Sequence, residues 1–344
     1  ILGGWRFVEN SSMDEKYNCS SNHSACYDDN GHGTHVAGII ASNNTTYRGV
    51  APDSKLVVVK ALNSEGSGSL SNVIAGINYC VNHSEEYNIS VISMSLGTYE
   101  TWSSYCDDNE DLSVLVSAIN NATAKNISVV VASGNGGNTA GISAPACIQN
   151  ATPVGSVNSY DSISYFSNKW SLPQIFAPGE SITSTCVSNS YCTKLGTSMA
   201  TPHVSASFAL INQYLNLKGQ KKTPQDLKNL FISTGINIDG NSNHSRIDVY
   251  LAYINVSNKK IFIYPTNLNF SLEPGSEQTL NLSIDSENKM NISITFSNLT
   301  NSNRLLENLN IFAWVDGNLS HNATGNEILT INNTNSTTIN INLT

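Results

Sequence analysis

Three short segments carry the side chains that could do chemistry in this sequence. Residues 28–41 read DDNGHGTHVAGIIA, so His32 lies between two glycines at the start of a run of small residues. Glycines let the backbone and a substrate approach closely, and an imidazole at the start of such a segment can act as a general base. His35 follows three residues later, which leaves metal binding by the two histidines as an alternative.

The second segment, residues 196–206, reads GTSMATPHVSA and leads into an apolar helix that we predict to continue through Leu215. A serine at the start of a helix has backbone N–H groups and the positive end of the helix dipole beside it. This position favours both a nucleophile and the stabilisation of an oxyanion. Ser198 is therefore a candidate nucleophile, and a plain helix cap is the alternative role.

The third segment, residues 132–137, reads ASGNGG and follows a run of β-branched residues. Asn135 would then lie at the carboxyl edge of a parallel sheet, where open α/β sheets bind ligands. Its amide could donate a hydrogen bond to a developing oxyanion. A left-handed turn residue among glycines is the alternative.

Alternating strands and helices are predicted around these segments. Nearly continuous apolar runs are typical of strands buried on both faces, and they occupy residues 56–62, 89–95 and 127–133. Residues 70–82 and 112–124 carry apolar side chains at three- and four-residue spacing, as helices that cover a parallel sheet do. We therefore predict a doubly wound, mostly parallel α/β domain in residues 1–253.

The pattern changes after residue 253. Short alternating runs separated by polar residues, glycine or proline predict a small all-β sandwich in residues 267–344, preceded by a linker at residues 254–266.

Composition and charge exclude several classes of protein. Of the 344 residues, 40% are apolar, and no apolar run approaches the roughly 18 residues that a membrane-spanning helix needs. The net charge of −9 argues against binding to nucleic acid or to an anionic membrane surface. We expect a soluble globular protein that acts as a monomer.

Asparagines and cysteines indicate an extracellular or cell-surface protein. Asparagine followed two positions later by serine or threonine recurs about twenty times, each a possible glycan acceptor, although enrichment in these residue types is an alternative explanation. Seven cysteines indicate disulfides, although their connectivity cannot be deduced from sequence. The predicted bridges are Cys19–Cys26, Cys186–Cys192 and Cys106–Cys147, with Cys80 free.

Together, the three segments resemble the subtilisin-like serine proteases, the subtilases, over residues 1–253. The resemblance implies that His32 is the general base, Ser198 the nucleophile and Asn135 an oxyanion donor, with the Ser198 N–H as the second donor. It also implies that substrate binds as an added strand, with its first side chain in a specificity pocket. The residues implied for substrate binding are Ser95, Leu96 and Gly97 on one wall, Ala132, Ser133 and Gly134 on the other, and Ser143 on the floor.

One departure from the family concerns the acid of the catalytic triad. In subtilases this aspartate follows a strand upstream of the stretch matched by residues 1–8, in an Asp-Thr/Ser-Gly segment that this sequence lacks. Asp14, Asp28 and Asp29 are more typical of loop carboxylates. We therefore expect an amino-terminally truncated subtilase, with a propeptide upstream, that is weakly active or inactive by itself. The missing strand would leave a sheet edge or part of the core unfilled.

Two observations concern calcium. Residues 41–52 are shorter than the calcium-binding loop of the bacterial subtilisins and offer few oxygen ligands, so they do not support a structural calcium ion. Residues 309–317 and 325–327 resemble the prepeptidase carboxyl-terminal β-sandwich. Asn310 stands where that domain often has an acidic residue, which weakens the case for calcium there.

The sequence as a whole predicts a secreted serine endopeptidase that hydrolyses polypeptides through an acyl-enzyme intermediate, without an organic cofactor. Two alternatives remain open. One is a catalytically inactive, protease-like glycoprotein that serves in binding or adhesion. The other is a metallohydrolase that uses His32 and His35.

Overall fold

The computed structural model describes residues 1–8, 18–19, 26–257, 262–264, 278–295, 310–315, 318–324 and 328–343. Contacts between residues divide the chain into two units, Ile1–Ala252 and Tyr253–Thr344. Among the described residues, no helix has both the length and the apolar character required to cross a membrane.

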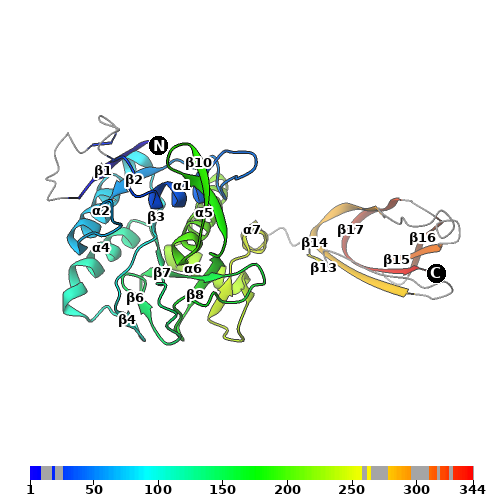
Figure 1. Cartoon of the computed structure of the whole chain (residues 1–344). Coiled ribbons are helices and arrows are strands. Elements are labelled where there is room, and N and C mark those ends of the chain that lie inside the picture. The colour runs from blue at the N-terminus through cyan, green and yellow to red at the C-terminus, as the bar shows by residue number, and fades with distance from the viewer. Residues whose placement is uncertain are drawn as a thin grey trace. The chain divides into compact units, whose positions relative to one another are not determined.

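A six-stranded sheet forms the centre of the first unit, with the strand order β11-β12-β8-β7-β5-β3 (Figure 1). All neighbours from β12 to β3 pair in parallel, and only β11 is antiparallel to β12. The predicted mostly parallel α/β fold is therefore confirmed for this unit. The strands are β3 (Val91–Met94), β5 (Ser128–Ala132), β7 (Ala151–Val157), β8 (Gln174–Pro178), β11 (Ile236–Asn237) and β12 (His244–Arg246).

Helices cover the sheet and pack on one another. The long helix α5 contacts β3, β5, β7 and β8, whereas α4 contacts β5 and packs on α2. Both predicted crossover helices are present, although the second begins with the short 3-10 turn η3, whose Asp111 and Leu112 N–H groups donate to the side-chain oxygen of Asn109. The helices are α1 (His32–Ala41), α2 (Leu70–Asn82), α3 (Ser84–Tyr87), η3 (Glu110–Leu112), α4 (Ser113–Ala124), α5 (Thr197–Leu217), α6 (Pro224–Thr234) and α7 (Val249–Ser257).

Strand β5 is buried along its whole length, as the sequence predicted. Val129 and Val131 join the apolar cluster that includes Leu115 and Ile119 of α4. Successive side chains of a strand point to opposite faces, so the equally buried Val130 lies on the other face of the sheet. Apolar packing on both faces thus explains the continuous run of β-branched residues.

Strand β2 differs from its prediction. Together with β1 (Gly3–Arg6), β2 (Val57–Lys60) forms a separate parallel pair, and all four of its residues are only half-buried. The reason is that β2 and β3 do not pair in the part of the chain that the structure describes. A cavity of about 1740 Å³ lies between them, lined by Val58 and Val59 on one side and by Ser93 and Met94 on the other. The facing edges of β2 and β3 therefore keep unpaired backbone groups.

Three disulfides join the predicted cysteine pairs, and Cys80 is free and buried. One of them closes the hairpin of β9 (Ile182–Cys186) and β10 (Ser190–Lys194). The bridge between Cys106 and Cys147 joins the loops that follow β4 (Thr101–Trp102) and β6 (Ile142–Ser143), which pair with each other.

Removing the Cys106–Cys147 bridge is expected to lower the free energy of unfolding by about 4 kcal/mol, because it constrains 41 residues of the unfolded chain. The Cys186–Cys192 bridge, with a sequence separation of 6, should contribute only about 2 kcal/mol. Urea unfolding of the two double alanine variants measures both values. Equal losses would contradict an explanation based on loop length.

The second unit contributes five antiparallel strands in the order β13-β14-β17-β15-β16. Residues 278–295 form one long strand, β14, rather than short separate runs, and its pairing with β17 is irregular between Asp285 and Ile292. Much of the predicted sandwich in residues 267–344 lies outside the described residues, as does Asp14, and the sandwich stays a prediction. The strands are β13 (Phe262–Tyr264), β14 (Gln278–Thr295), β15 (Asn310–Val315), β16 (Asn318–Thr324) and β17 (Ile328–Leu343).

Candidate active site

The cavity between β2 and β3 extends to the carboxyl ends of the strands, where the three segments found in the sequence meet. His32 from α1, Asn135 from the loop after β5, and Ser198 from α5 all line it. These residues are far apart in the sequence, and the parallel sheet brings them together because β3 and β5 end at the same edge.

His32 is the first residue of α1, and the carboxylate of Asp28 fixes the start of this helix. The carboxylate accepts hydrogen bonds from the backbone N–H groups of Gly31 (2.7 Å) and Thr34 (2.6 Å) and from the Thr34 hydroxyl (2.6 Å). Burial raises the pKa of Asp28, but these hydrogen bonds and that from Asn30 outweigh it and hold the pKa below its ordinary value. Asp28 is therefore committed to the helix start, and within residues 26–257 no hydrogen bond joins the His32 ring to a carboxylate.

Ser198 is the second residue of α5, after an N-cap glycine, Gly196, with φ of 144°. The first N–H groups of a helix have no acceptor within the helix, so the Ser198 N–H can donate a hydrogen bond to a ligand. The Ser198 hydroxyl lies 3.3 Å from the carbonyl oxygen of Ser95, and the Ser95 hydroxyl donates to the carbonyl of Ser198 (2.7 Å). Ser198 and His32 line the same cavity without a hydrogen bond between them, as is common in free enzymes.

Asn135 is oriented by Thr197, a residue that the sequence analysis missed. The amide oxygen of Asn135 accepts hydrogen bonds from the Thr197 N–H (2.8 Å) and the Thr197 hydroxyl (2.9 Å). Because its oxygen is taken up in this way, the amide nitrogen of Asn135 turns away from Thr197 and is left as a donor. The threonine directly before Ser198 is the local signal that could have identified it.

Residues 4–268 match the subtilase family. The chain belongs to this family of serine peptidases. Among its relatives are two proteins of Bacillus subtilis (strain 168). The minor extracellular protease Epr is 37% identical over 57% of this chain and 29% of its own length. The major intracellular serine protease is 39% identical over 64% of this chain and 65% of its own length.

The chain therefore spans less than two thirds of the length of either relative. Among solved structures, the subtilase is similar to a cold-adapted subtilisin-like serine proteinase, with a TM-score of 0.55 and 32% identity. The similarity covers 71% of this chain and 78% of the other.

In this subtilase the small residues of α1 allow close packing against a neighbouring hairpin. The helix contacts α5 and the β9 strand. A side chain at Gly38 would collide with Ser184 and Thr185 of β9. The Ser184 hydroxyl donates to the carbonyl of His35, and the Thr185 hydroxyl donates to that of Thr34. The β9-β10 hairpin, closed by its disulfide, thus holds the helix that carries His32.

His35 faces this hairpin rather than the cavity. It is fully buried, and its Nε2 lies 3.1 Å from the carbonyl oxygen of Ile182 and 3.0 Å from that of Cys192. The metal-binding alternative required His32 and His35 to face one ion, and they do not. Among the described residues, no group of three His, Cys, Asp or Glu side chains could hold a metal ion.

The electrostatic environment lowers the pKa of His32 and so favours its neutral form. Burial lowers the pKa of His32, and the positive charge of Lys194 on β10 lowers it further, whereas the charge of Asp28 acts in the opposite direction. A neutral imidazole can accept a proton from a hydroxyl, as a general base must.

Replacing Lys194 with glutamine is expected to move the acid limb of the pH–rate profile to higher pH. The limb reports the pKa of the base, and the variant removes a charge that lowers the pKa of His32. The rate of ester hydrolysis as a function of pH measures the shift. Lys218→Gln, at the exposed end of α5, is the matched control. A shift to lower pH, or the same shift in both variants, would contradict the assignment.

Asn168 holds the loop on both sides of Asn135. This side chain is 2% exposed, and its oxygen accepts hydrogen bonds from the N–H groups of Gly136 (3.0 Å) and Asn138 (2.9 Å). Its backbone N–H donates to the carbonyl of Gly134 (3.0 Å). The sequence analysis missed Asn168, because no local pattern marks a residue that acts on a loop 30 residues away.

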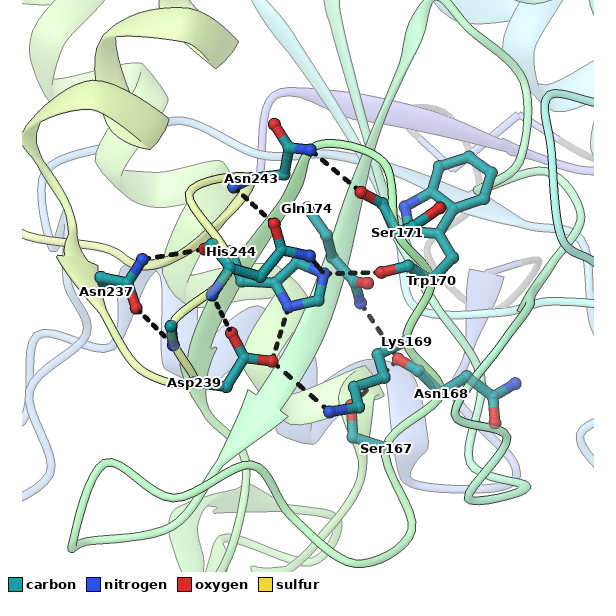
Figure 2. A network of polar contacts seen from close by, with 12 residues as sticks. Ser167, Asn168, Lys169, Trp170, Ser171, Gln174, Asn237, Asp239, Asn243 and His244 are labelled. Atoms are coloured by element: carbon teal, nitrogen blue, oxygen red, sulfur yellow. Dashed lines mark hydrogen bonds and ion pairs between the residues drawn. The ribbon is translucent and has the colours of Figure 1, made fainter.

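A polar network fixes the segment that carries Asn168 (Figure 2). The Lys169 amine lies 3.4 Å from the carboxylate of Asp239. The buried His244 places Nδ1 at 2.8 Å from the same carboxylate and Nε2 at 2.6 Å from the carbonyl oxygen of Trp170. Lys169 is thus anchored to Asp239 in the loop before β12, and Trp170 to His244 at the start of β12.

Asn168→Ala is expected to lower kcat by about 10- to 100-fold with a smaller change in KM, because Asn135 would lose its fixed position. Asn168→Asp keeps oxygen acceptors for the N–H groups of Gly136 and Asn138, so it should retain most of the activity. Steady-state kinetics of both variants, with urea unfolding as a check on stability, test this. Equal losses of kcat in the two variants would show that the hydrogen-bond acceptor is not what matters.

Most of the residues implied for substrate binding surround one part of the cavity. Ser133 is the exception, because it is fully buried and its hydroxyl donates to the Asn168 carbonyl (2.9 Å). A side chain added at Gly97 would come within 3.2 Å of the Ser143 Cβ, so the glycine wall and the small Ser143 lie close together. The residues that line the cavity are Ser95, Leu96, Gly97, Ala132, Gly134 and Ser143.

Proposed function

We propose that this chain is the main part of a secreted serine endopeptidase that cleaves polypeptides through an acyl-enzyme intermediate. One observation carries the proposal: an imidazole, a serine at a helix start and an amide donor oriented by Thr197 line a single cavity. The peptidase domain would be residues 1–253, with a linker at residues 254–266 and an accessory sandwich at residues 267–344. The proposed linker includes the end of α7 and strand β13, which pairs with β14.

In the proposed reaction, the Ser198 hydroxyl attacks the carbonyl carbon of the substrate while His32 takes the hydroxyl proton. The oxyanion accepts hydrogen bonds from the Asn135 amide and the Ser198 N–H. His32 then gives its proton to the leaving amine, and water releases the acyl group by the reverse sequence of steps.

The substrate is proposed to lie as an extended strand between the two walls of the cavity. A side chain of the substrate would enter between Gly97 and Gly134 toward Ser143. Gly97 and Gly134 have no side chains, so they leave the pocket between the two walls open. Because Ser143 at its floor is small and uncharged, the pocket favours apolar or aromatic side chains of the substrate.

The three disulfides support secretion, because such bonds persist in oxidising compartments. The relatives include both extracellular and intracellular proteases, so the compartment rests on the cysteines and on the asparagine-linked acceptor sequences. The resemblance to subtilases also implies synthesis with a propeptide, and we propose a monomeric mature protein.

We further propose that residues 1–344 react slowly by themselves. Among residues 26–257, no carboxylate is hydrogen-bonded to the His32 ring, so within this range the imidazolium that forms during acylation has no directly bonded acid. The unpaired edges of β2 and β3 and the cavity between them could receive a further strand that carries such an acid.

Reaction with a fluorophosphonate tests the proposal, because a serine is phosphonylated readily only where a general base activates its hydroxyl and donors stabilise the oxyanion. We expect slow incorporation of one phosphonyl group, located by peptide mapping at Ser198. Labelling at other serines would overturn the proposed site. A rate no faster than that of the folded Ser198→Ala variant would favour a protease-like protein that serves in binding.

A further inference from the structure

Acceptor sequences for asparagine-linked glycans are more frequent in this chain than composition explains. The chain has 47 asparagines, and 21 of them are followed two positions later by serine or threonine. Serine and threonine together account for 73 of the 344 residues, so random placement would give about 10 such sequences.

The acceptor sequences avoid the active-site cavity. None of the six asparagines that line it is followed two positions later by serine or threonine, whereas the frequency in the whole chain would give about three. These six residues are Asn30, Asn63, Asn135, Asn138, Asn168 and Asn189.

Among residues 26–257, seven acceptor asparagines are exposed, and four of them lie toward the opposite edge of the sheet. Asn88 comes shortly before β3 and Asn126 shortly before β5, and these two strands are direct neighbours. Asn82 ends α2, and Asn121 lies in the second half of α4, which packs on α2. All four asparagines are exposed, whereas the catalytic segments follow the carboxyl ends of β3 and β5.

Local structure explains some of these residues and leaves others unexplained. Asn88 and Asn126 have φ of 52° and 59°, a conformation that asparagine adopts readily after a helix. The positive φ does not explain why Ser90 and Ser128 follow these asparagines two positions later. Ser128 is fully buried at the start of β5, and its hydroxyl has no hydrogen-bond partner. Such a group is unfavourable in an apolar strand, whereas an acceptor sequence requires it.

We propose that Asn82, Asn88, Asn121 and Asn126 carry asparagine-linked glycans on the edge of the sheet opposite the active-site cavity. The hydroxyl of Ser128 is part of the acceptor sequence and is inaccessible in the folded chain, so the glycan is added to Asn126 before β5 forms. This inference rests on the proposed secretion of the chain and is independent of its catalytic activity.

The chemistry requires a lipid-linked oligosaccharide as the second substrate, supplied by a secretory membrane. The amide nitrogen of the asparagine forms a bond to the anomeric carbon of the sugar, and the bond from that carbon to the pyrophosphate oxygen breaks. The amide loses one proton, which leaves with the lipid pyrophosphate.

Peptide mapping by mass spectrometry, on the chain exported through a eukaryotic secretory pathway, tests the proposal. We expect sugar-bearing peptides at all four asparagines. Ser128→Ala should remove the glycan from Asn126 alone, and Ser128→Thr should keep it. Ala140→Thr is the matched control, because it creates an acceptor sequence at Asn138, within the cavity.

The control separates the possible outcomes. A glycan at Asn138 in the Ala140→Thr variant, together with unmodified Asn88 and Asn126, would overturn the proposal, as would the absence of glycans everywhere. Occupancy is read from mass, so a catalytically inactive chain with glycans at the four sites would contradict only the proposed function.

The order of events has its own test. Chain produced without glycans is incubated with an oligosaccharyltransferase and its lipid-linked substrate, either folded or reduced and unfolded. Modification of Asn126 is expected only in the unfolded chain. Equal modification of the folded chain would overturn the proposed order.

Discussion

Replacing Ser198 with alanine in the complete protease that we propose is expected to abolish the burst of alcohol released from an activated ester. Acylation requires the Ser198 oxygen. The Thr197 hydroxyl, which also lies at the start of α5, is buried and donates to the Asn135 amide oxygen. The rate of acylation should fall by at least about 10⁴-fold. Stopped-flow measurement of the burst, at enzyme concentrations close to those of the ester, gives this rate directly.

Ser205→Ala is the matched control for this experiment. Ser205 lies in the same helix, and its buried hydroxyl oxygen lies 2.8 Å from the Ser93 hydroxyl and 3.0 Å from the carbonyl oxygen of Thr201. Its removal should cost about 1 kcal/mol of stability and leave the burst in place. A burst of unchanged size and rate in Ser198→Ala would show that another group is acylated.

Short motifs predicted the location of the site because their chemistry depends on local structure. A histidine between glycines, an asparagine after a buried strand and a serine before an apolar helix each mark the end of an element, and parallel strands end at a common edge. The apolar spacing also gave the bounds of α2 (Leu70–Asn82), since that helix buries one face throughout.

The residues that orient the site could not be predicted from the sequence in the same way. The bond from Thr197 to Asn135 joins positions 62 residues apart, and Asn168 acts on its loop through backbone N–H groups that have no sequence signature. The half-buried state of β2 was missed for a related reason. The apolar run of β2 predicts a strand, whereas the burial of β2 depends on which strand pairs with its second edge.

Replacing Asn135 with alanine is expected to slow turnover by about 10²- to 10³-fold with little change in substrate affinity. The amide nitrogen is free to donate because Thr197 occupies the amide oxygen, and it is needed only when charge develops on the substrate oxygen. Asn135→Asp should be impaired at least as strongly, since a carboxylate cannot donate a hydrogen bond and would repel the oxyanion. Values of kcat and KM for both variants measure the effect.

Asn138→Ala separates the role of the Asn135 amide from the integrity of the loop. Asn138 lines the same cavity, and its amide donates to the Thr101 hydroxyl (2.8 Å), away from Ser198. If the Asn135 amide stabilises the oxyanion, Asn135→Ala should lower kcat while Asn138→Ala leaves kcat nearly unchanged. Equal losses in the two variants would instead point to the conformation of the loop, the property that Asn168 controls. The two asparagines on one loop therefore distinguish a group that touches the transition state from one that holds the backbone.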